Sequence, residues 1–317
     1  MKNKRIFVTG GAGFIGSHLV EKLVELENEV VVVDNLLRGN KIPSDVFKKI
    51  EFHNADVRDS SKILKLSRGA DVILHFAAIL GVDIVADNPV ETMDTEAVGM
   101  QNIAQAAIKN NIPKILYAST SGVYGHNALE KSVTEDIMID PKTSYAMAKR
   151  YNEIYLGALH EEKGINAIAL RFFNVYGLRQ DNRMVTPRFF EQAISNKPIT
   201  VFGNGNQTRD FTYIDDTVKA TIELGEKVNG FEIFNVANEE EIAIGTLANK
   251  IKEISNSSSE IVYINAPTKR YDYEVGRRFG SSEKLFKNIG YKPSTGIDEG
   301  LNVIYKDMLK SKSIEEA

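Results

Sequence analysis

Tyr145 and Lys149 stand four residues apart within Ser144–Tyr155, a segment predicted to be helical. Residues four apart lie on one face of a helix, so both side chains can share a site. A free tyrosine has a pKa of about 10, and its use as a base near neutral pH needs a shift of about 3 units, or roughly 4 kcal/mol. The Lys149 ammonium can supply part of that shift because it stabilises the tyrosinate. By itself the pair carries little weight, since tyrosine and lysine at this spacing usually belong to a solvated helix face.

Three hydroxyl residues, Ser119, Thr120 and Ser121, close a strand predicted at Lys114–Ser119. The carboxyl end of such a strand opens onto the ligand crevice of an α/β sheet, so a hydroxyl there can hold a substrate oxygen. Taken alone, the tripeptide favours the simpler interpretation, in which it ends the strand through local hydrogen bonds to the backbone.

Glycines follow the first predicted strand in the segment TGGAGFIG, which spans Thr9–Gly16. Gly10, Gly13 and Gly16 have the spacing G-x-x-G-x-x-G, and a helical pattern follows over His18–Leu26. Glycine permits a tight turn and lets the backbone approach a pyrophosphate, whose charge then meets the free N–H groups of the helix N-terminus. The context predicts a dinucleotide-binding loop.

Asp34 lies at the end of the second predicted strand, where an acidic residue can accept hydrogen bonds from both hydroxyls of the adenosine ribose. Its charge would repel a 2′-phosphate, which favours NAD over NADP, although Arg38 nearby leaves room for the phosphorylated cofactor. Asp56 and Val57 are expected to flank the adenine. The oxidised nicotinamide ring would add a second cation beside Tyr145.

Short apolar runs alternate with segments of helical period along the first half of the chain. Near-continuous Val, Ile and Leu predict strands buried on both faces of a doubly wound parallel sheet. The predicted strands are Lys4–Thr9, Glu29–Asp34, Asp71–Phe76, Lys114–Ser119 and Ala167–Phe172.

After about Phe173 the alternation becomes irregular, which indicates a second, smaller α/β region. Phe211–Ile214 and Phe231–Ala237 are predicted to be strands that return to the first sheet, and Ile242–Ile254 an amphipathic helix of the smaller region. We therefore divide the chain into two interleaved regions: residues 1–174 with 211–237, which carry the dinucleotide-binding motifs, and residues 175–210 with 238–317, which form the smaller region.

Composition excludes several classes of function. The chain has 317 residues, 39 Lys and Arg against 43 Asp and Glu, and no cysteine. The net charge of −4 argues against nucleic acid as a partner, and the lack of cysteine removes thiolate nucleophiles and cysteine-ligated metals. The five histidines lack metal-ligand spacing, and His75 is expected to be a hydrogen-bonded core residue. No apolar run is long enough to cross a membrane, so we expect a cytoplasmic protein.

Together these motifs resemble the extended short-chain dehydrogenase/reductase family, in its nucleotide-sugar epimerase, dehydratase and decarboxylase branch. The similarity runs from Arg5 to about Pro293. It is carried, in the family's order, by VTGGAGFIGSHL, VVDN, LHFAA, YASTSGVYG, SYAMAK, LRFFNVYG, ITVFGNGNQTRDFTYIDD and FNVAN. The resemblance implies a Rossmann domain with NAD, a nucleoside-diphosphate sugar as substrate, and a homodimer built on two helices of each subunit.

Site residues follow from the resemblance by position. Tyr145 would be the base on a sugar hydroxyl, Lys149 would hold the ribose and lower the tyrosine pKa, and Thr120 would anchor the same hydroxyl. The cofactor would meet Gly10, Gly13, Phe14, Ile15, Gly16, Asp34, Asn35, Asp56, Val57, Phe76, Ala77, Ala78, Ser119, Tyr145, Lys149 and Phe173. The nucleotide sugar would meet Ser121, Asn174, Arg183, Val201, Phe202, Arg209, Arg270 and Arg277, in which arginine suits phosphate oxygens.

The reaction is decided beside Thr120. Dehydratases of the branch resemble one another in carrying acidic residues after the catalytic threonine, where this chain has Ser121 and Gly122. Decarboxylases tend to carry a glutamate at the second position and an arginine for the carboxylate, which Arg183 could be. A 4-epimerase needs no further acid or base, so we expect 4-epimerisation through a transient 4-keto sugar. Decarboxylation and 4,6-dehydration stay open, as do net 4-oxidation and a non-catalytic NAD sensor.

Three positions depart from the family pattern. Glu96 stands where many relatives have asparagine in a helix that lines the cofactor site, Leu178 replaces a common proline, and Gly280 replaces a common aspartate. The segment Ile79–Asp83 is expected to face the sugar, but no physical argument links it to one hexose.

Overall fold

The computed structural model describes residues 1–79, 82–128, 132–265 and 276–315. The strands of the large sheet are β1 (Arg5–Thr9), β2 (Glu29–Asp34), β3 (Glu51–Asn54), β4 (Val72–His75), β5 (Lys114–Thr120), β6 (Asn166–Phe172) and β10 (Phe231–Val236). The other strands are β7 (Asn174–Tyr176), β8 (Ile199–Phe202), β9 (Thr208–Tyr213), β11 (Glu241–Ala243), β12 (Ile261–Ile264) and β13 (Arg277–Arg278).

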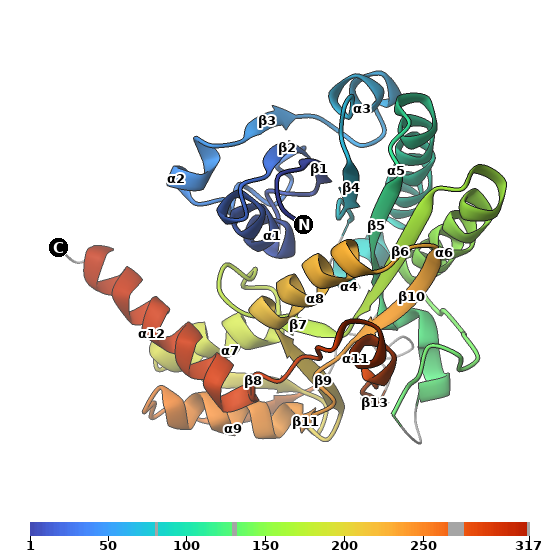
Figure 1. Ribbon diagram of the computed structural model, residues 1–317. Helices are drawn as coiled ribbons and strands as arrows, with labels where there is room; N and C mark the ends of the chain where they lie inside the picture. The colour runs from blue at the N-terminus through green and yellow to red at the C-terminus, as the bar shows by residue number, and fades with distance from the viewer. Residues whose placement is uncertain (80–81, 129–131, 266–275, 316–317) are drawn as a thin grey trace.

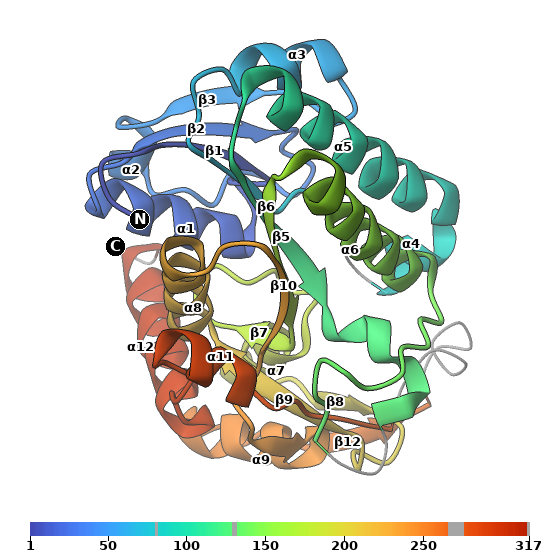
Figure 2. The ribbon, with the colours of Figure 1, turned by 45° about the vertical axis from the view of Figure 1, so that its right-hand side comes forward.

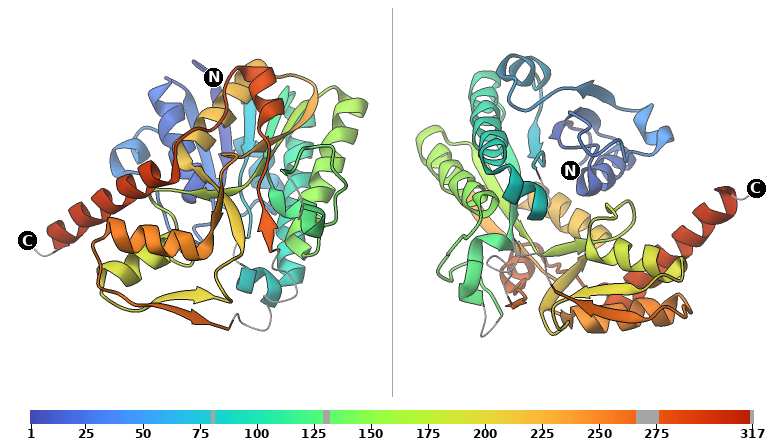
Figure 3. Two further views of the ribbon diagram at one scale, coloured as in Figure 1. Left: turned by 90° about the horizontal axis from the view of Figure 1, so that it is seen from below. Right: turned by 180° about the vertical axis from the view of Figure 1, so that it is seen from behind.

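Helices alternate with these strands. They are α1 (Phe14–Glu25), α2 (Ser44–Phe47), α3 (Ser60–Leu66), α4 (Val82–Asp87), α5 (Pro89–Asn110), the 3₁₀ segment η1 (Ser121–Ala128), α6 (Ser144–Lys163), α7 (Val185–Ile194), α8 (Ile214–Lys227), α9 (Ile244–Ile254), α11 (Glu283–Ile289) and α12 (Ile297–Glu315). Helix α12 packs against α9, and its far end projects from the molecule (Figure 3).

A seven-stranded parallel sheet with the order β10-β6-β5-β4-β1-β2-β3 forms the frame of the molecule (Figure 1). Helices α1 and α8 cover one face, and α3, α5 and α6 cover the other (Figure 2). Alternate residues of β1 point to opposite faces of the sheet, since Ile6 and Val8 belong to one hydrophobic core and Phe7 to the other. The predicted doubly wound α/β fold is confirmed.

One predicted strand is in a different place. Phe211–Ile214 does not return to the large sheet, because β9 pairs with β7, β11 and β13 in a smaller sheet. Strand β7 leads the chain out of the large sheet directly after β6, and the Tyr176 ring on it packs edge-on against Phe211 and Tyr213. Strand β10 does pair with β6, as predicted for Phe231–Ala237. The division of the chain into two domains stays a prediction.

Local predictions hold at the elements that carry the motifs, with shifted ends. Helix α1 begins at Phe14, earlier than the apolar spacing from His18 indicates, and α6 continues past Tyr155 to Lys163. Strand β3 is not predicted from the sequence, because it is an edge strand whose residues are all partly or fully exposed. Such a strand lacks the apolar run by which its neighbours are recognised.

Candidate active site

The turn between β1 and α1 is built for close backbone approach. Gly10 has a φ of +71°, and a Cβ there would lie 2.5 Å from the backbone nitrogen of Ala77. A Cβ on Gly16 would lie 2.1 Å from the carbonyl oxygen of Gly10. Gly13 precedes α1 without a capping side chain, so the first-turn N–H groups of Phe14 and Ile15 are open to an anion. This cradle fits the pyrophosphate of a dinucleotide.

Asp34 lies at the end of β2 beside this turn. Its carboxylate accepts hydrogen bonds from the backbone N–H groups of Ala12 at 3.0 Å and Leu36 at 2.8 Å, which aim it across the loop. Partial burial raises the pKa of Asp34 from its ordinary value, against those two hydrogen bonds. The half-buried carboxylate is positioned to accept hydrogen bonds from a ribose.

The neighbouring predicted cofactor residues lie along the same edge of the sheet. Asp56 pairs with Arg58 through two hydrogen bonds of 2.9 and 2.7 Å, and this pairing lowers the pKa of Asp56. Val57 is buried and its carbonyl accepts from Asn102 at 2.9 Å. Phe76, Ala77 and Ala78 follow β4, Asn35 follows β2, and Phe173 follows β6.

The structure brings Tyr145 and Lys149 together beside the end of β5. Thr143 caps α6 by accepting from the backbone N–H of Ala146 at 3.1 Å, which places Tyr145 in the first helical turn. Lys149 lies one turn later, with its Nζ 5.3 Å from the centre of the Tyr145 ring. Thr120 is the last residue of β5, a strand against which α6 packs.

A buried carboxylate, Glu96 of α5, is the group that Lys149 meets. Its Oε2 lies 3.0 Å from Lys149 Nζ, and both side chains are almost completely buried, at 0% and 1% exposure. Tyr117 of β5 donates a hydrogen bond of 3.0 Å to the same Oε2, and Asn152 donates one of 2.8 Å to the Tyr117 hydroxyl. We call Glu96, Lys149, Tyr117, Asn152 and Tyr145 the Glu96 cluster.

This carboxylate changes the expected electrostatics. Burial raises the pKa of Glu96, and burial lowers that of Lys149 while Glu96 opposes the change. Loss of solvent around the hydroxyl raises the pKa of Tyr145, and the Glu96 charge raises it further. Without a bound cofactor, burial and the Glu96 charge thus raise the pKa of Tyr145, and the lowering expected from Lys149 together with an oxidised nicotinamide ring stays a prediction.

His75 of β4 borders the Glu96 cluster. Its ring stacks on Tyr117 at 5.7 Å between centres, and its Nδ1 shares a hydrogen bond of 2.7 Å with Thr9 Oγ1. Burial, with a contribution from Lys149, lowers the pKa of His75 to about 3. The predicted hydrogen-bonded core histidine is confirmed.

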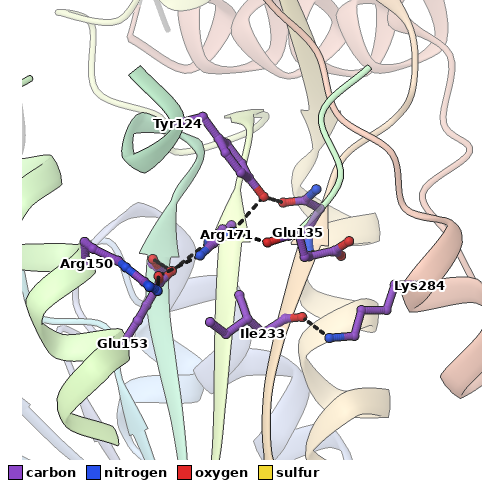
Figure 4. A network of polar contacts seen from close by, with 9 residues as sticks. Tyr124, Glu135, Arg150, Glu153, Arg171, Ile233 and Lys284 are labelled. Carbon is purple, nitrogen blue, oxygen red and sulfur yellow. Dashed lines mark hydrogen bonds and ion pairs between the residues drawn. The ribbon is translucent and has the colours of Figure 1, made fainter. Parts of the chain in front are cut away.

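A second buried ion pair lies one helical turn further along α6 (Figure 4). Arg171 of β6 donates two hydrogen bonds of 2.8 Å to the two carboxylate oxygens of Glu153. Ser119 donates to Glu153 at 2.6 Å, and Arg150 donates at 3.1 Å. Arg171 also donates to the Tyr124 hydroxyl at 2.9 Å. We call these residues the Glu153 network; Ser119, predicted to meet the cofactor, is held by it.

The predicted substrate residues are only partly brought together. Asn174 begins β7, which pairs with β9, the strand that carries Arg209. Arg277 pairs with Glu241 at 2.7 and 2.8 Å, and Arg183 pairs with Asp181 in an exposed turn. Of the remaining predicted residues, Ser121 is buried after β5, Val201 is buried in the core, Phe202 ends β8, and Arg270 lies outside the described residues.

Arg278 is a further candidate for the site that is not predicted from the sequence. It stands opposite Arg209 in the β13–β9 register. Burial and the neighbouring Arg209 lower the pKa of Arg278 to about 10. Two guanidinium groups side by side suit a diphosphate, but the short strand that pairs them has no signal in the sequence.

The structure gives a physical reason for glycine at position 280, one of the departures from the family pattern. A Cβ on Gly280 would lie 2.3 Å from the Phe173 ring, so the phenyl group takes the space of a side chain there. Nothing in the structure explains leucine at position 178, because its backbone carbonyl accepts a hydrogen bond of 2.9 Å from His18 and a proline carbonyl could accept the same bond. In the segment Ile79–Asp83, residues 80 and 81 lie outside the described residues.

Within residues 1–79, 82–128, 132–265 and 276–315, no three His, Asp or Glu side chains gather as a metal ion would require. In that same part of the chain, no helix combines the length and the apolar character needed to cross a bilayer.

The fold and the site together define a dinucleotide-binding protein of the short-chain dehydrogenase/reductase type. The model of the NAD dependent epimerase/dehydratase family matches residues 6–237. A UDP-N-acetyl-alpha-D-glucosaminuronate decarboxylase of Bacillus cytotoxicus is 36% identical over 311 residues, with 94% of this chain and 95% of that protein covered.

Two further proteins are named for epimerisation. A protein of Methanocaldococcus jannaschii, provisionally named a UDP-glucose 4-epimerase, is 37% identical over 302 residues, with 93% of this chain and 95% of that protein covered. The solved structure of the UDP-glucose 4-epimerase from Thermotoga maritima with UDP-glucose has a TM-score of 0.91 and 30% identity, covering 97% and 99% of the two chains. This chain belongs to the NAD dependent epimerase/dehydratase family, and it is an enzyme that uses NAD.

Proposed function

We propose that the protein is an NAD-dependent 4-epimerase of a nucleoside-diphosphate sugar. The observation that carries this proposal is the pair of residues after Thr120. Ser121 and Gly122 have no carboxyl group, and a Cβ on Gly122 would already lie 3.3 Å from the Thr120 side chain and 3.6 Å from that of Ala146. Directly after Thr120 the chain thus offers no further acid or base, and epimerisation is the reaction of this family that needs no base other than Tyr145.

Each catalytic residue has a distinct task in this mechanism. Thr120 holds the sugar 4-hydroxyl by a hydrogen bond, and the Tyr145 phenolate takes its proton. Lys149 binds the cofactor ribose. When bound, NAD would accept the hydride from the sugar carbon and would give it back to the other face of that carbon. The 4-keto sugar then turns its other face to the site, and the Tyr145 hydroxyl returns the proton as the 4-hydroxyl forms again.

We propose a UDP-sugar as the substrate, because all three compared proteins are named for UDP-sugars. Arg209 and Arg278 on adjacent strands would hold the diphosphate, with Asn174 beside them. Arg183 offers little support for a decarboxylase, because its side chain is 51% exposed and already paired with Asp181.

We also propose a homodimer formed by α5 and α6. Met147, Tyr151 and Ile154 lie on one face of α6 and are 54%, 42% and 58% exposed, and Val90 and Val98 of the adjacent α5 are exposed too. Such a stripe is typical of a partner helix surface. Light scattering should show a dimer for the wild type and a monomer for the double variant M147E/I154E. A cytoplasmic location stays a prediction.

The reaction is tested by product analysis. Purified enzyme with NAD is incubated with UDP-glucose, UDP-N-acetylglucosamine or UDP-glucuronate, and the products are identified by NMR. We expect the 4-epimer of one of them, with no accumulation of NADH. Released carbon dioxide with a pentose product would establish a decarboxylase, a 4-keto-6-deoxy product a dehydratase, and stoichiometric NADH a 4-dehydrogenase.

Tyr145→Phe provides the matched control. Loss of one hydroxyl should lower turnover by about 10²- to 10⁴-fold, the range for general acid–base catalysis, and leave NAD binding intact. Unchanged turnover in this variant would remove Tyr145 from the mechanism.

A further inference from the structure

Glu96 is a buried charge that the proposed reaction does not use. Its Oε2 meets Lys149, Tyr117 and Asn152 at 3.0, 3.0 and 3.5 Å, while its Oε1 is buried without a hydrogen-bond partner. Lys149 Nζ lies 4.7 Å from the centre of the Tyr117 ring and 5.3 Å from that of Tyr145. The ammonium therefore stands between a carboxylate and two phenols.

The ionisable groups around Glu96 come from three elements. Lys149 and Tyr145 face it from α6, Tyr117 from β5, and His75 lies behind Tyr117 on β4. Burial holds the pKa of His75 at about 3, so its ring is neutral at physiological pH. Glu153, the other carboxylate near Lys149, is already neutralised by Arg171.

The net charge of the Glu96 cluster depends on whether Tyr145 is protonated or ionised. With Tyr145 protonated, Glu96 and Lys149 cancel and the cluster is neutral. With Tyr145 ionised, the cluster carries one net negative charge, which burial makes costly. The ring of oxidised NAD carries one positive charge and that of reduced NAD carries none, so an ionised Tyr145 is balanced beside the oxidised form and a protonated one beside the reduced form.

We propose that Glu96 is a positioning residue that restricts ionisation of Tyr145 to the enzyme with oxidised cofactor, by cancelling the Lys149 charge that would otherwise stabilise the tyrosinate. The inference rests on the proposed function for Tyr145 as the base. It does not depend on which sugar reaction follows. Its consequence is a base that is switched on by NAD⁺ and switched off in the reduced enzyme.

The test measures the titration of Tyr145 directly. Tyrosinate absorbance in the near ultraviolet is followed against pH in enzyme loaded with NAD⁺ and in enzyme loaded with NADH, and the signal of Tyr145→Phe is subtracted. In the wild type with NADH, Tyr145 should titrate above the pKa of about 10 of free tyrosine, and with NAD⁺ well below the NADH value. A wild-type NADH titration at or below that of free tyrosine overturns the proposal without any variant.

Glu96→Gln removes the charge and keeps the shape. In the NADH-loaded variant the Tyr145 titration should move down by about 1 unit or more, the usual effect of removing a nearby like charge. Glu96→Asp keeps the charge and should restore the wild-type titration. An unchanged titration in Glu96→Gln, or an equal shift in Glu96→Asp, overturns the proposal, because either result assigns Glu96 a purely structural role. Glu96→Asn replaces Glu96→Gln if circular dichroism shows that the latter is unfolded.

Glu153→Gln is the matched control. It removes an equally buried carboxylate of α6, one helical turn after Lys149, whose charge is already balanced by Arg171. We expect its Tyr145 titration to stay within a few tenths of a unit of the wild type, and a shift as large as that of Glu96→Gln contradicts the inference. No sugar enters these measurements, so a failed epimerase assay leaves them valid, and a normal epimerase with an unshifted Glu96→Gln titration refutes the inference alone.

Discussion

Two buried glutamate–cation pairs lie beside α6, and they differ in how completely they are satisfied. In the Glu153 network both carboxylate oxygens of Glu153 accept from Arg171, and Ser119 and Arg150 complete the set (Figure 4). In the Glu96 cluster one oxygen of Glu96 has no partner. A closed network fixes the packing of α6 on the sheet, whereas an incomplete one retains the capacity to exchange partners when a ligand binds.

The choice of cation supports the same distinction. Arginine keeps its proton under all ordinary conditions, so Arg171 is a permanent charge that requires a permanent partner. Lysine can lose its proton when buried, and burial indeed lowers the pKa of Lys149. The Glu153 network is thus suited to structure and the Glu96 cluster to function.

Glu153→Gln should have the largest effect on stability. It leaves the Arg171 charge buried without a carboxylate, so we expect a loss of about 3–5 kcal/mol in the free energy of unfolding. Glu96→Gln should cost less than half of that, because one oxygen of Glu96 already lacks a partner and the replacement removes fewer hydrogen bonds. Chemical denaturation of the two variants checks the order. Equal losses would show that the two pairs do not differ as described.

The local part of this architecture could be predicted from the sequence. Near-continuous apolar runs identify β1, β2, β4, β5 and β6, because a strand buried on both faces needs no alternating pattern. The run at Phe211–Ile214 is equally apolar but belongs to the smaller sheet. The strand that pairs with this run depends on the direction in which β7 leaves the large sheet and on the packing of the Tyr176 ring. Neither can be read from the local sequence.

The candidate site divides in the same way. Tyr145 and Lys149 are one helical turn apart, so their proximity follows from spacing alone. The sequence identifies Glu96 only as a departure from the family pattern. Its ion pair with Lys149 cannot be predicted, because the pair depends on how α5 packs against α6. Arg278 and Arg209 likewise meet through strand pairing between distant segments.

The Glu96 cluster should also respond to acid through His75. The folded pKa of about 3 lies below the ordinary value of 6.5, so the unfolded chain takes up a proton first as the pH falls. The free energy of unfolding should therefore drop by about 1.4 kcal/mol per pH unit below 6.5, or about 2–3 kcal/mol over two units. His75→Phe keeps the stacking on Tyr117 but cannot titrate, so its unfolding should lack this slope. The same slope in wild type and variant would assign the acid sensitivity to other groups.

Arg150→Ala should have the smallest effect on the free energy of unfolding. It tests whether Glu153 remains fully hydrogen-bonded without Arg150, the partly exposed residue of the network. The Arg150 side chain is 33% exposed, and its single bond of 3.1 Å to Glu153 competes with water. Partly exposed pairs contribute about 1 kcal/mol or less, so the variant should unfold within that margin of the wild type in denaturant. A loss above about 2 kcal/mol would mean that Arg171 alone does not satisfy Glu153. The Glu153 network would then also depend on a solvent-exposed partner. In that case the two pairs would not differ in how completely the carboxylate is hydrogen-bonded, and this difference could not explain why one pair is structural and the other functional.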